Sequence, residues 1–320
     1  MTPHEHDAEL RAAMQRIRAE VEKAVVGQGG VISGLLVALL ARGHVLLEGV
    51  PGVAKTLLVR SFSRALGLDT KRVQFTPDLM PGDVTGSLIY DAKAGEFEFR
   101  RGPVFTNVLL ADEINRTPPK TQAALLEAME ERQVSADGQT LALPDPFLVA
   151  ATQNPVEHEG TYTLPEAQLD RFMMKLIVDM PDEASEVQVL RRHADGFSPR
   201  ALNDLQPVTT PAELLAAQQA VANVAVADDV LAYIVALARA TRSAPSVELG
   251  ASPRASAALL AAAKAWAWLS GSVAVTPDHV QAMLTPVWRH RISLRPDAQM
   301  EGVSADTVLA ATMRQTVVPI

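Results

Sequence analysis

The stretch Gly49-Val50-Pro51-Gly52-Val53-Ala54-Lys55-Thr56 decides the fold. It follows the apolar run Val45-Leu46-Leu47 and precedes Leu57-Leu58-Val59, where the spacing of apolar residues becomes helical. Backbone N–H groups at a helix start point outward and the helix dipole favours an anion there, so this layout is typical of a phosphate-binding loop. In such a loop the lysine reaches the outer phosphates and the hydroxyl holds Mg²⁺. The stretch therefore predicts a nucleotide site that includes Lys55, Thr56 and the neighbouring Leu57.

Ala54 departs from the usual loop pattern. It stands where GxxxxGK[ST] has its second glycine. A methyl group is a small intrusion if the residue keeps helical dihedrals, so we expect a loop that is intact but not ideal. A Gly-rich turn from strand to helix without a ligand is the alternative that these eight residues leave open.

Composition places the chain among soluble globular proteins. Its 320 residues can form about two domains, and 48% hydrophobic with 21% charged residues is ordinary for that class. A net charge of -8 argues against broad nucleic-acid binding. The N-terminus has no basic segment followed by an apolar one, so we expect no secretory signal. The most apolar run, residues 31–41, is too short for a membrane span. We expect a cytoplasmic protein.

Cysteine and histidine usage restricts the chemistry further. The chain has no cysteine, which excludes disulfides, thiolate metal sites and cysteine nucleophiles. Its seven histidines have no zinc spacing such as HExxH. His158, between Glu157 and Glu159, is expected in a solvated loop, with metal binding left open.

Strand and helix patterns alternate as far as residue 178. Continuous apolar strands are typical of a mostly parallel sheet buried on both faces, so we expect an α/β core. Two additional segments alternate around turn sequences and predict β-hairpins, within residues 78–105 and 133–143, the second centred on Asp137-Gly138. The strands of the sheet are expected at 45–48, 73–75, 107–111, 147–151 and 172–178.

From Pro181 the strand signal disappears. Thr210-Pro211-Ala212-Glu213 is a capping box with proline at the first helical position. Helices are expected at 228–242, 253–269 and 277–284. We therefore predict a nucleotide-binding core over residues 1–204 and a small all-helical domain over 205–320.

Polar residues at strand ends complete the predicted site. Asp112-Glu113 follows an apolar strand, where Asp112 can hold the metal through water and Glu113 can polarise the attacking water. Asn154 ends the next strand and is placed to contact the γ-phosphate or that water. Alone, each could be an ordinary charged or turn residue at a strand end.

Two arginines are further candidates. Arg171 immediately precedes the last strand and can reach the γ-phosphate of a neighbouring subunit as an arginine finger, or it can pair with Asp170 on the surface. Arg254 lies in the first turn of a helix after Ser252-Pro253, where a cation opposes the helix dipole. An anion facing Arg254, such as bound nucleotide, would explain that position.

With these motifs in order, the chain resembles the MoxR family of AAA+ ATPases. The resemblance covers residues 48–254. It is carried by Glu48 to Thr56, by Leu110-Ala111-Asp112-Glu113-Ile114-Asn115-Arg116-Thr117-Pro118-Pro119-Lys120-Thr121-Gln122, by Ala151-Thr152-Gln153-Asn154-Pro155, by Glu159-Gly160-Thr161-Tyr162, by Leu164-Pro165-Glu166-Ala167-Gln168-Leu169-Asp170-Arg171-Phe172, and by Gly250-Ala251-Ser252-Pro253-Arg254.

The resemblance assigns a role to each motif. It implies ATP and Mg²⁺ as ligands, the Walker B pair at Asp112 and Glu113, sensor 1 at Asn154, the arginine finger at Arg171 and sensor 2 at Arg254. It implies that hairpin 78–105 is the helix-2 insert and hairpin 133–143 the pre-sensor-1 insert, which commonly line the pore of a ring. Arg116 is a candidate second inter-subunit arginine. The residues implied to contact nucleotide are Val26, Gly27 and Gln28 on the adenine side and Gly49, Val50, Pro51, Gly52, Val53, Ala54, Lys55, Thr56 and Leu57 in and after the Walker A loop.

The resemblance also implies a biological role. Similar proteins form rings, expected here to be hexameric, and act as chaperone-like motors that remodel partners or help to load their metal cofactors. They often work with a separate protein that contains a von Willebrand A domain. Two alternatives remain at this point: a motor acting on DNA, and a nucleotide-gated adaptor with little hydrolysis.

Overall fold

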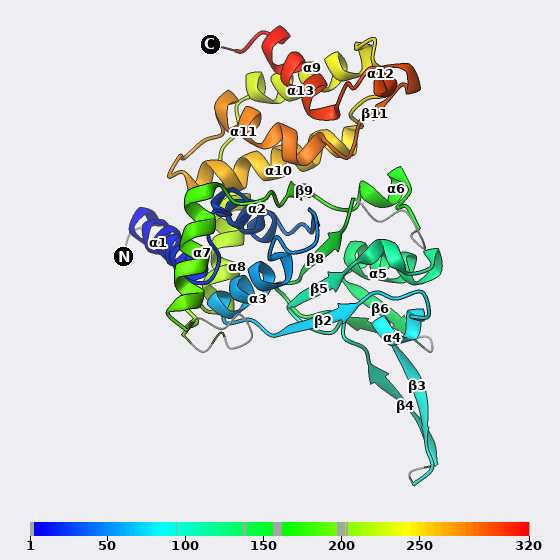
Figure 1. Ribbon diagram of the computed structural model, residues 1–320. Coiled ribbons are helices and arrows are strands. Elements are labelled where there is room, and N and C mark those ends of the chain that lie inside the picture. Colours follow the sequence, from blue (N-terminus) through cyan, green and yellow to red (C-terminus); the bar gives the residue numbers. More distant parts are fainter. Residues whose placement is uncertain are drawn as a thin grey trace.

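The computed structural model describes residues 3–93, 95–136, 139–155, 162–196, 202 and 204–319. An α/β core with a central sheet carries a helical unit at the C-terminal end and a long hairpin that projects away from the core (Figure 1). The predicted α/β fold with a following helical domain is confirmed.

The central sheet has five parallel strands in the order β2-β5-β8-β1-β9. Alternate residues of its inner strands belong to two separate hydrophobic cores: Leu46 and Leu109 lie in one, Val45 and Leu110 in the other. Since both faces are buried, these strands read as unbroken apolar runs. The strands are β1 (Val45–Glu48), β2 (Thr70–Gln74), β5 (Val108–Asp112), β8 (Leu148–Gln153) and β9 (Met174–Ile177).

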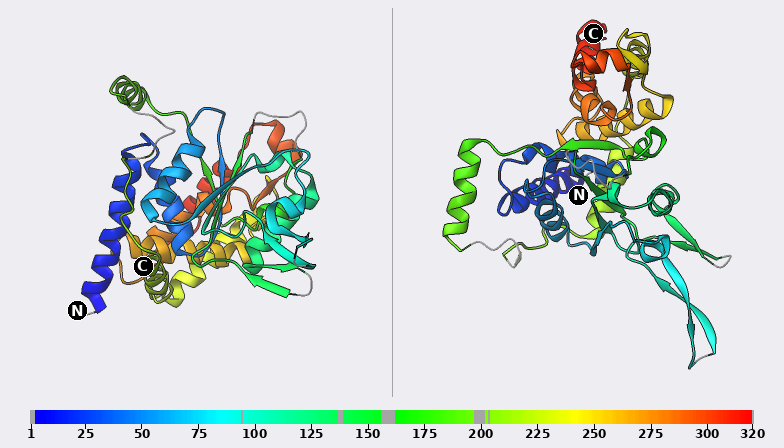
Figure 2. Two further views of the ribbon diagram at one scale, coloured as in Figure 1. Left: turned by 90° about the horizontal axis from the view of Figure 1, so that it is seen from below. Right: turned by 45° about the vertical axis from the view of Figure 1, so that its right-hand side comes forward.

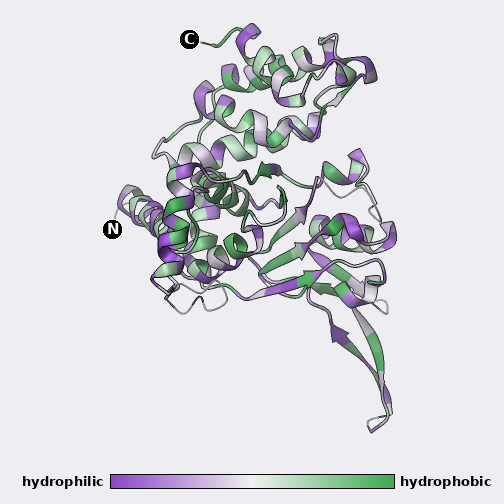
Figure 3. Cartoon of the chain, viewed as in Figure 1, coloured by the Kyte–Doolittle hydropathy of each residue, from purple (hydrophilic) through white to green (hydrophobic). Residues whose placement is uncertain are grey.

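Helices cover both faces of the sheet. The core that contains Val45 is filled from α1, α2 and α3, whereas α4 and α5 fill the core that contains Leu46. Figure 3 shows the central strands mostly green, with purple residues gathered on the outer helix surfaces. Helix α3 begins at Lys55 and ends before Gly67, whose φ of 66° closes it in the left-handed region. The helices are α1 (Pro3–Glu22), α2 (Gly29–Leu40), α3 (Lys55–Leu66), α4 (Pro81–Thr85) and α5 (Pro119–Glu131), with the 3₁₀ turn η1 (Ile114–Arg116) before α5.

Both predicted hairpins are present as antiparallel pairs. They are β3 (Gly86–Asp91) with β4 (Glu96–Arg101), and β6 (Gln133–Ala136) with β7 (Gln139–Ala142). The first extends away from the body in both Figure 1 and Figure 2. It carries an exposed aromatic pair, Tyr90 and Phe97, with ring centroids 5.3 Å apart. The turn residues Asp137 and Gly138 of the second hairpin lie outside the described residues.

Two helices connect the core to the C-terminal unit. Helix α7 stands away from the body (Figure 2), and none of its twelve described residues is buried. Helix α8 packs against α1 and α2 of the core as well as against α10. The boundary at residues 204/205 stays a prediction. The remaining helices are α6 (Glu166–Leu169), α7 (Glu183–Ala194), α8 (Pro211–Ala222), α9 (Asp228–Ser243), α10 (Pro253–Leu269), α11 (Pro277–Trp288), α12 (Pro296–Met300) and α13 (Ala305–Gln315).

The C-terminal unit is not purely helical, which corrects one expectation. Strands β10 (Val247–Leu249) and β11 (Ser293–Leu294) pair antiparallel. They are too short to leave a periodic pattern, and their partners lie more than forty residues apart in the chain. In the described part of the chain, every helix is too short or too polar to cross a membrane.

Candidate active site

The loop between β1 and α3 is shaped by two glycines. At Gly49 an added Cβ would lie 2.5 Å from the carbonyl oxygen of Val178, so only glycine fits against that strand end. Gly52 has a φ of 92°, a conformation that side chains disfavour. Between them the chain makes the tight turn that aims the first N–H groups of α3 out of the loop.

Ala54 does not have the helical dihedrals that the expectation of an intact loop assumed. Its φ and ψ are 62° and 25°, in the left-handed region, which costs a residue with a side chain about 1–2 kcal/mol. Its carbonyl oxygen nevertheless accepts the first bond of α3, from the N–H of Leu58 at 2.9 Å. Ala54 is thus the N-terminal cap of α3, in a backbone conformation that glycine adopts without strain.

Lys55 lies across the mouth of the loop. Its Nζ donates to the carbonyl oxygens of Gly49 and Val50, the second at 3.1 Å. The amine is therefore held beside the N–H groups at the start of α3. Lysine and helix dipole together make this the most anion-attracting position in the loop.

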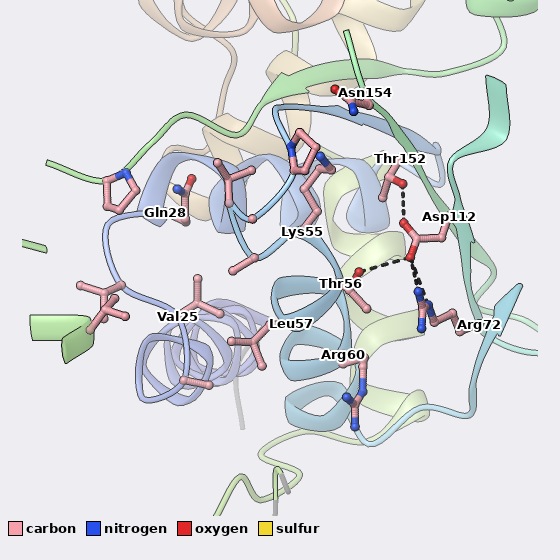
Figure 4. A pocket seen from close by; sticks show the side chains of 18 of the residues that line it. Val25, Gln28, Lys55, Thr56, Leu57, Arg60, Arg72, Asp112, Thr152 and Asn154 are labelled. Atoms are coloured by element: carbon pink, nitrogen blue, oxygen red, sulfur yellow. Dashed lines mark hydrogen bonds and ion pairs between the residues drawn. The ribbon is translucent and has the colours of Figure 1, made fainter. Parts of the chain in front are cut away.

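Asp112 is the hub of the polar network opposite the loop (Figure 4). Its Oδ1 accepts from Thr152 Oγ1 at 2.6 Å, and its Oδ2 accepts from Thr56 Oγ1 at 3.2 Å. Arg72 donates to the same Oδ2 from Nη2 at 2.7 Å and from Nε at 3.1 Å. A hydroxyl and a carboxylate at hydrogen-bond distance are oxygen donors that suit Mg²⁺, which takes few protein ligands beside substrate phosphates. Thr56 and Asp112 therefore fit the predicted metal.

Glu113 is held in a fixed orientation beside Asp112. Its φ is 57°, a left-handed conformation that is uncommon outside glycine. Its N–H donates to Thr152 Oγ1 at 2.9 Å. Its Oε2 accepts from Gln74 Nε2 at 2.6 Å and from Arg116 Nη1 at 3.0 Å. The carboxylate thus points into the cavity at the end of β5, tethered by two donors.

These groups line one cavity of about 670 Å³, a size that suits a small-molecule ligand. Asn154 lines it at the end of β8, and Arg60 lines it from α3. Helix α7 closes one side with Val189, Arg192 and His193. The predicted residues that line the cavity are Val26, Gln28, Pro51, Gly52, Val53, Ala54, Lys55, Thr56, Leu57, Asp112, Glu113 and Asn154.

Three of the residues predicted to contact nucleotide are not among the residues that line the cavity. Gly49 and Val50 contribute the carbonyls that hold Lys55. Gly27 has a φ of 76°, and an added Cβ there would lie 3.1 Å from Ser185 Oγ at the start of α7. Beside it, Gln28 donates to the carbonyl oxygen of Asp179 at 2.9 Å. These contacts join the segment around residue 27 to the chain that leads into α7.

Arg171 and Arg254 are not among the residues that line this cavity. Arg171 pairs with Glu130 at 2.8 Å rather than with Asp170. Arg254 reaches Glu130 at 3.3 Å and Asp170 at 3.5 Å. Asp170 in turn binds Arg291 at 2.6 Å. The two candidate arginines are therefore brought together with each other, at the junction of α5, α6 and α10, and not with the phosphate loop of their own chain.

Several residues that line the cavity were not predicted from the sequence. Arg72 and Gln74 lie on β2, and the register pairs Gln74 with Asp112. The two residues are separated by two positions on an edge strand, so both side chains lie on the same face of the sheet. This spacing is the one sequence feature that could have indicated them. Thr152 could be recognised only as part of the strand end before Asn154. The α7 residues carry no local signal, because the chain path alone brings them to the cavity.

His158 and the motif residues 159–161 lie outside the described residues. Within the described ranges, no group of three or more His, Asp or Glu side chains could hold a metal ion.

A strand, a phosphate loop with lysine and threonine, and an acidic pair at the neighbouring strand end define a P-loop ATPase of the AAA+ class. The family model described as "ATPase family associated with various cellular activities (AAA)" matches residues 44–174, and the model of the AAA lid domain matches residues 239–312. Both fall on the elements described above.

Comparisons over the whole chain are more specific. The chain is 47% identical to the uncharacterized protein YeaC of Bacillus subtilis, covering 98% of each. It is 43% identical to the chaperone MoxR1 of Mycobacterium tuberculosis, over 96% of this chain and 82% of that protein. A crystal structure of a putative ATPase from Cytophaga hutchinsonii superposes with a TM-score of 0.90 at 40% identity, covering 99% of this chain and 98% of that one. The chain belongs to the MoxR family of AAA+ ATPases, and it hydrolyses ATP to ADP and phosphate.

Proposed function

We propose that this ATPase is a Mg²⁺-dependent, ring-forming motor of the chaperone type that remodels client proteins. The observation that carries the proposal is the cavity in which Lys55 and Thr56 face Asp112 and Glu113. The name of the relative MoxR1, a chaperone, supports the role in remodelling. ATP is abundant in the cytoplasm, which is where we place the protein.

Within this cavity each residue has a task. The N–H groups at the start of α3 and the amine of Lys55 bind the phosphates, for which Lys55 exchanges the carbonyls of Gly49 and Val50. Thr56 and Asp112 hold Mg²⁺, which supplies electrostatic stabilisation of the phosphate charge. Glu113 accepts the proton of the attacking water. Asn154 positions that water from the end of β8, and residues 26–28 contact the adenine.

The position of Arg171 supports assembly. Charge developing on the γ-phosphate needs a cation, and an arginine finger supplies one from a neighbouring subunit in many such enzymes. Arg171 lies outside the cavity of its own chain and beside Arg254. Both arginines therefore serve the nucleotide of the next subunit in a closed ring, which we take to be a hexamer.

The variant Arg171→Ala tests the proposal. Its ATP turnover should fall by about 10³-fold while its affinity for ATP stays close to that of the parent chain. Arg289→Ala is the matched control, because Arg289 pairs with Asp306 on the C-terminal unit at 2.7 Å. Phosphate release and nucleotide anisotropy measure the two quantities. Unchanged turnover in Arg171→Ala would exclude the in-trans role.

The client and partner are the second part of the proposal. The hairpin of β3 and β4 extends the aromatic residues Tyr90 and Phe97 into solvent, as a substrate-contacting insert requires. We propose a client protein, with metal loading as one form of remodelling, and a separate partner with a von Willebrand A domain. A pull-down with a Glu113→Gln trap in ATP should recover both. Recovery that is equal with and without ATP would argue against nucleotide-driven remodelling.

A further inference from the structure

Arg72 binds the carboxylate on which the acidic pair depends. Its guanidinium donates to Asp112 Oδ2 from Nη2 at 2.7 Å and from Nε at 3.1 Å. Nη2 also donates to Gln74 Oε1 at 3.0 Å, which keeps the side chain directed along β2. In Figure 4, Arg72 approaches Asp112 from the side opposite Thr152, inside the same cavity as Lys55.

The oxygen that Arg72 contacts is also the one that bonds the hydroxyl expected to hold the metal. Oδ2 of Asp112 also accepts from Thr56 Oγ1, the hydroxyl expected to bind Mg²⁺. The other oxygen, Oδ1, accepts from the buried Thr152. A carboxylate oxygen has about two lone-pair sites, and Oδ2 already receives three donors. A cation or its water can therefore use this oxygen only in exchange for one of these donors, two of which belong to Arg72.

The two members of the pair differ in how easily they can move. The Asp112 side chain is 9% exposed and is fixed by Thr152, whereas the Arg72 side chain is 51% exposed. The half-exposed guanidinium can leave without stranding the buried carboxylate of Asp112, provided that the metal replaces its positive charge. It remains in the cavity when it leaves, and its planar fork matches a phosphate as well as a carboxylate.

We propose that Arg72 is a positioning residue that competes with Mg²⁺ for Asp112 and turns to the nucleotide phosphates when the metal takes the carboxylate. Arg72 thereby links metal binding to phosphate binding and sets the Mg²⁺ concentration that nucleotide binding requires. The inference rests on the Mg²⁺ part of the proposed function.

The test is a binding measurement that needs no turnover. The anisotropy of a fluorescent ADP analogue is followed while Mg²⁺ is titrated, and the midpoint is compared between the parent chain and Arg72→Ala. Without its competitor, Asp112 should take the metal at about twofold to fivefold lower Mg²⁺, the range expected for an ion pair whose cation is half-exposed. At saturating Mg²⁺ the same variant should bind the analogue about threefold or more weakly, because the guanidinium that turns to the phosphates is lost.

Two further variants sharpen the test. Lys71→Ala removes one positive charge from the neighbouring position of β2, where Lys71 donates to the carbonyl oxygen of Phe105 at 3.2 Å. It should leave both quantities unchanged. Arg72→Lys keeps the charge without the fork and should shift the midpoint less than Arg72→Ala. Circular dichroism melting checks that each variant is folded.

Each other outcome overturns the inference in a recognisable way. In the first, the parent chain requires Mg²⁺ while Arg72→Ala has the same or a higher Mg²⁺ midpoint. That result would refute competition between Arg72 and the metal but would not affect the assignment of the nucleotide site. An equal shift in Lys71→Ala reduces the effect to general charge. A parent chain that binds the analogue independently of Mg²⁺ overturns the inference together with the metal assignment.

Discussion

The conformation of Ala54 leads to a prediction whose sign distinguishes two loop geometries. Ala54→Gly restores the glycine of the phosphate-loop motif at an exposed position, so the change removes little packing. If Ala54 had right-handed helical dihedrals, glycine would destabilise the protein by about 1 kcal/mol. With its φ of 62°, the same substitution instead relieves strain.

The magnitude follows from two opposing effects. Replacing an alanine that is strained in the left-handed region stabilises the folded chain by about 1–2 kcal/mol. Glycine also gives the unfolded chain more freedom, which costs about 0.4–1 kcal/mol. We expect a net gain of about 0.5 kcal/mol in the free energy of unfolding. Nucleotide affinity should stay within about twofold, because glycine can keep the same loop conformation.

The assay is urea unfolding followed by circular dichroism, with anisotropy of a fluorescent nucleotide. Ala123→Gly is the matched control, since Ala123 is exposed within α5 and should lose about 1 kcal/mol. A loss in Ala54→Gly equal to that of the control would refute the left-handed geometry and return the loop to the conformation expected from sequence.

Three further predictions concern Glu113, the buried His44 and the buried Arg291. Glu113→Gln should lower ATP turnover by about 10²-fold or more with ATP affinity retained, because the base is lost; unchanged phosphate release would remove its role. Burial lowers the pKa of His44 to about 4, so the unfolded chain binds a proton that the native chain does not. The free energy of unfolding should therefore fall by up to about 3 kcal/mol as pH drops from about 6.5 to about 4. Urea unfolding at both pH values measures this loss, which should be smaller in His44→Asn. The side chain of Arg291 is 3% exposed and binds Asp170 and nearby carbonyls. Arg291→Ala should therefore lower the free energy of unfolding by about 3 kcal/mol, whereas Arg289→Ala should lower it by less than about 1 kcal/mol. Equal losses in urea unfolding would contradict the burial of Arg291.

The parts of the molecule that were predictable have local causes. Residues 49–56 combine glycine, proline, lysine and threonine in a short range, and β5 is a continuous apolar strand that ends in Asp112-Glu113. Each pattern depends only on neighbouring residues, so the loop, the buried strands and both hairpins could be expected before the structure was known. The capping box at Thr210, where the hydroxyl and Glu213 bond reciprocally, is equally local.

The parts that were missed depend on residues distant in the chain. The role of Arg72 follows from the pairing of β2 with β5, which no local pattern of β2 specifies. The ion pairs of Arg254 with Glu130 and Asp170 also join residues far apart in the chain, and its role toward nucleotide stays a prediction. Tertiary contacts decide both. The left-handed backbone of Ala54 was missed for another reason, because a residue with a side chain rarely adopts a positive φ.

The most direct measurement of the central claim is phosphate release from a mixture of two inactive variants. Lys55→Ala lacks a working loop but keeps Arg171, whereas Arg171→Ala keeps the loop and lacks the finger. In rings assembled at random from equal amounts, about one quarter of the interfaces combine an intact cavity with an intact finger, so we expect up to that fraction of the parent rate. A mixture no more active than its separate components, measured after subunit exchange, would contradict a site completed by the neighbouring subunit.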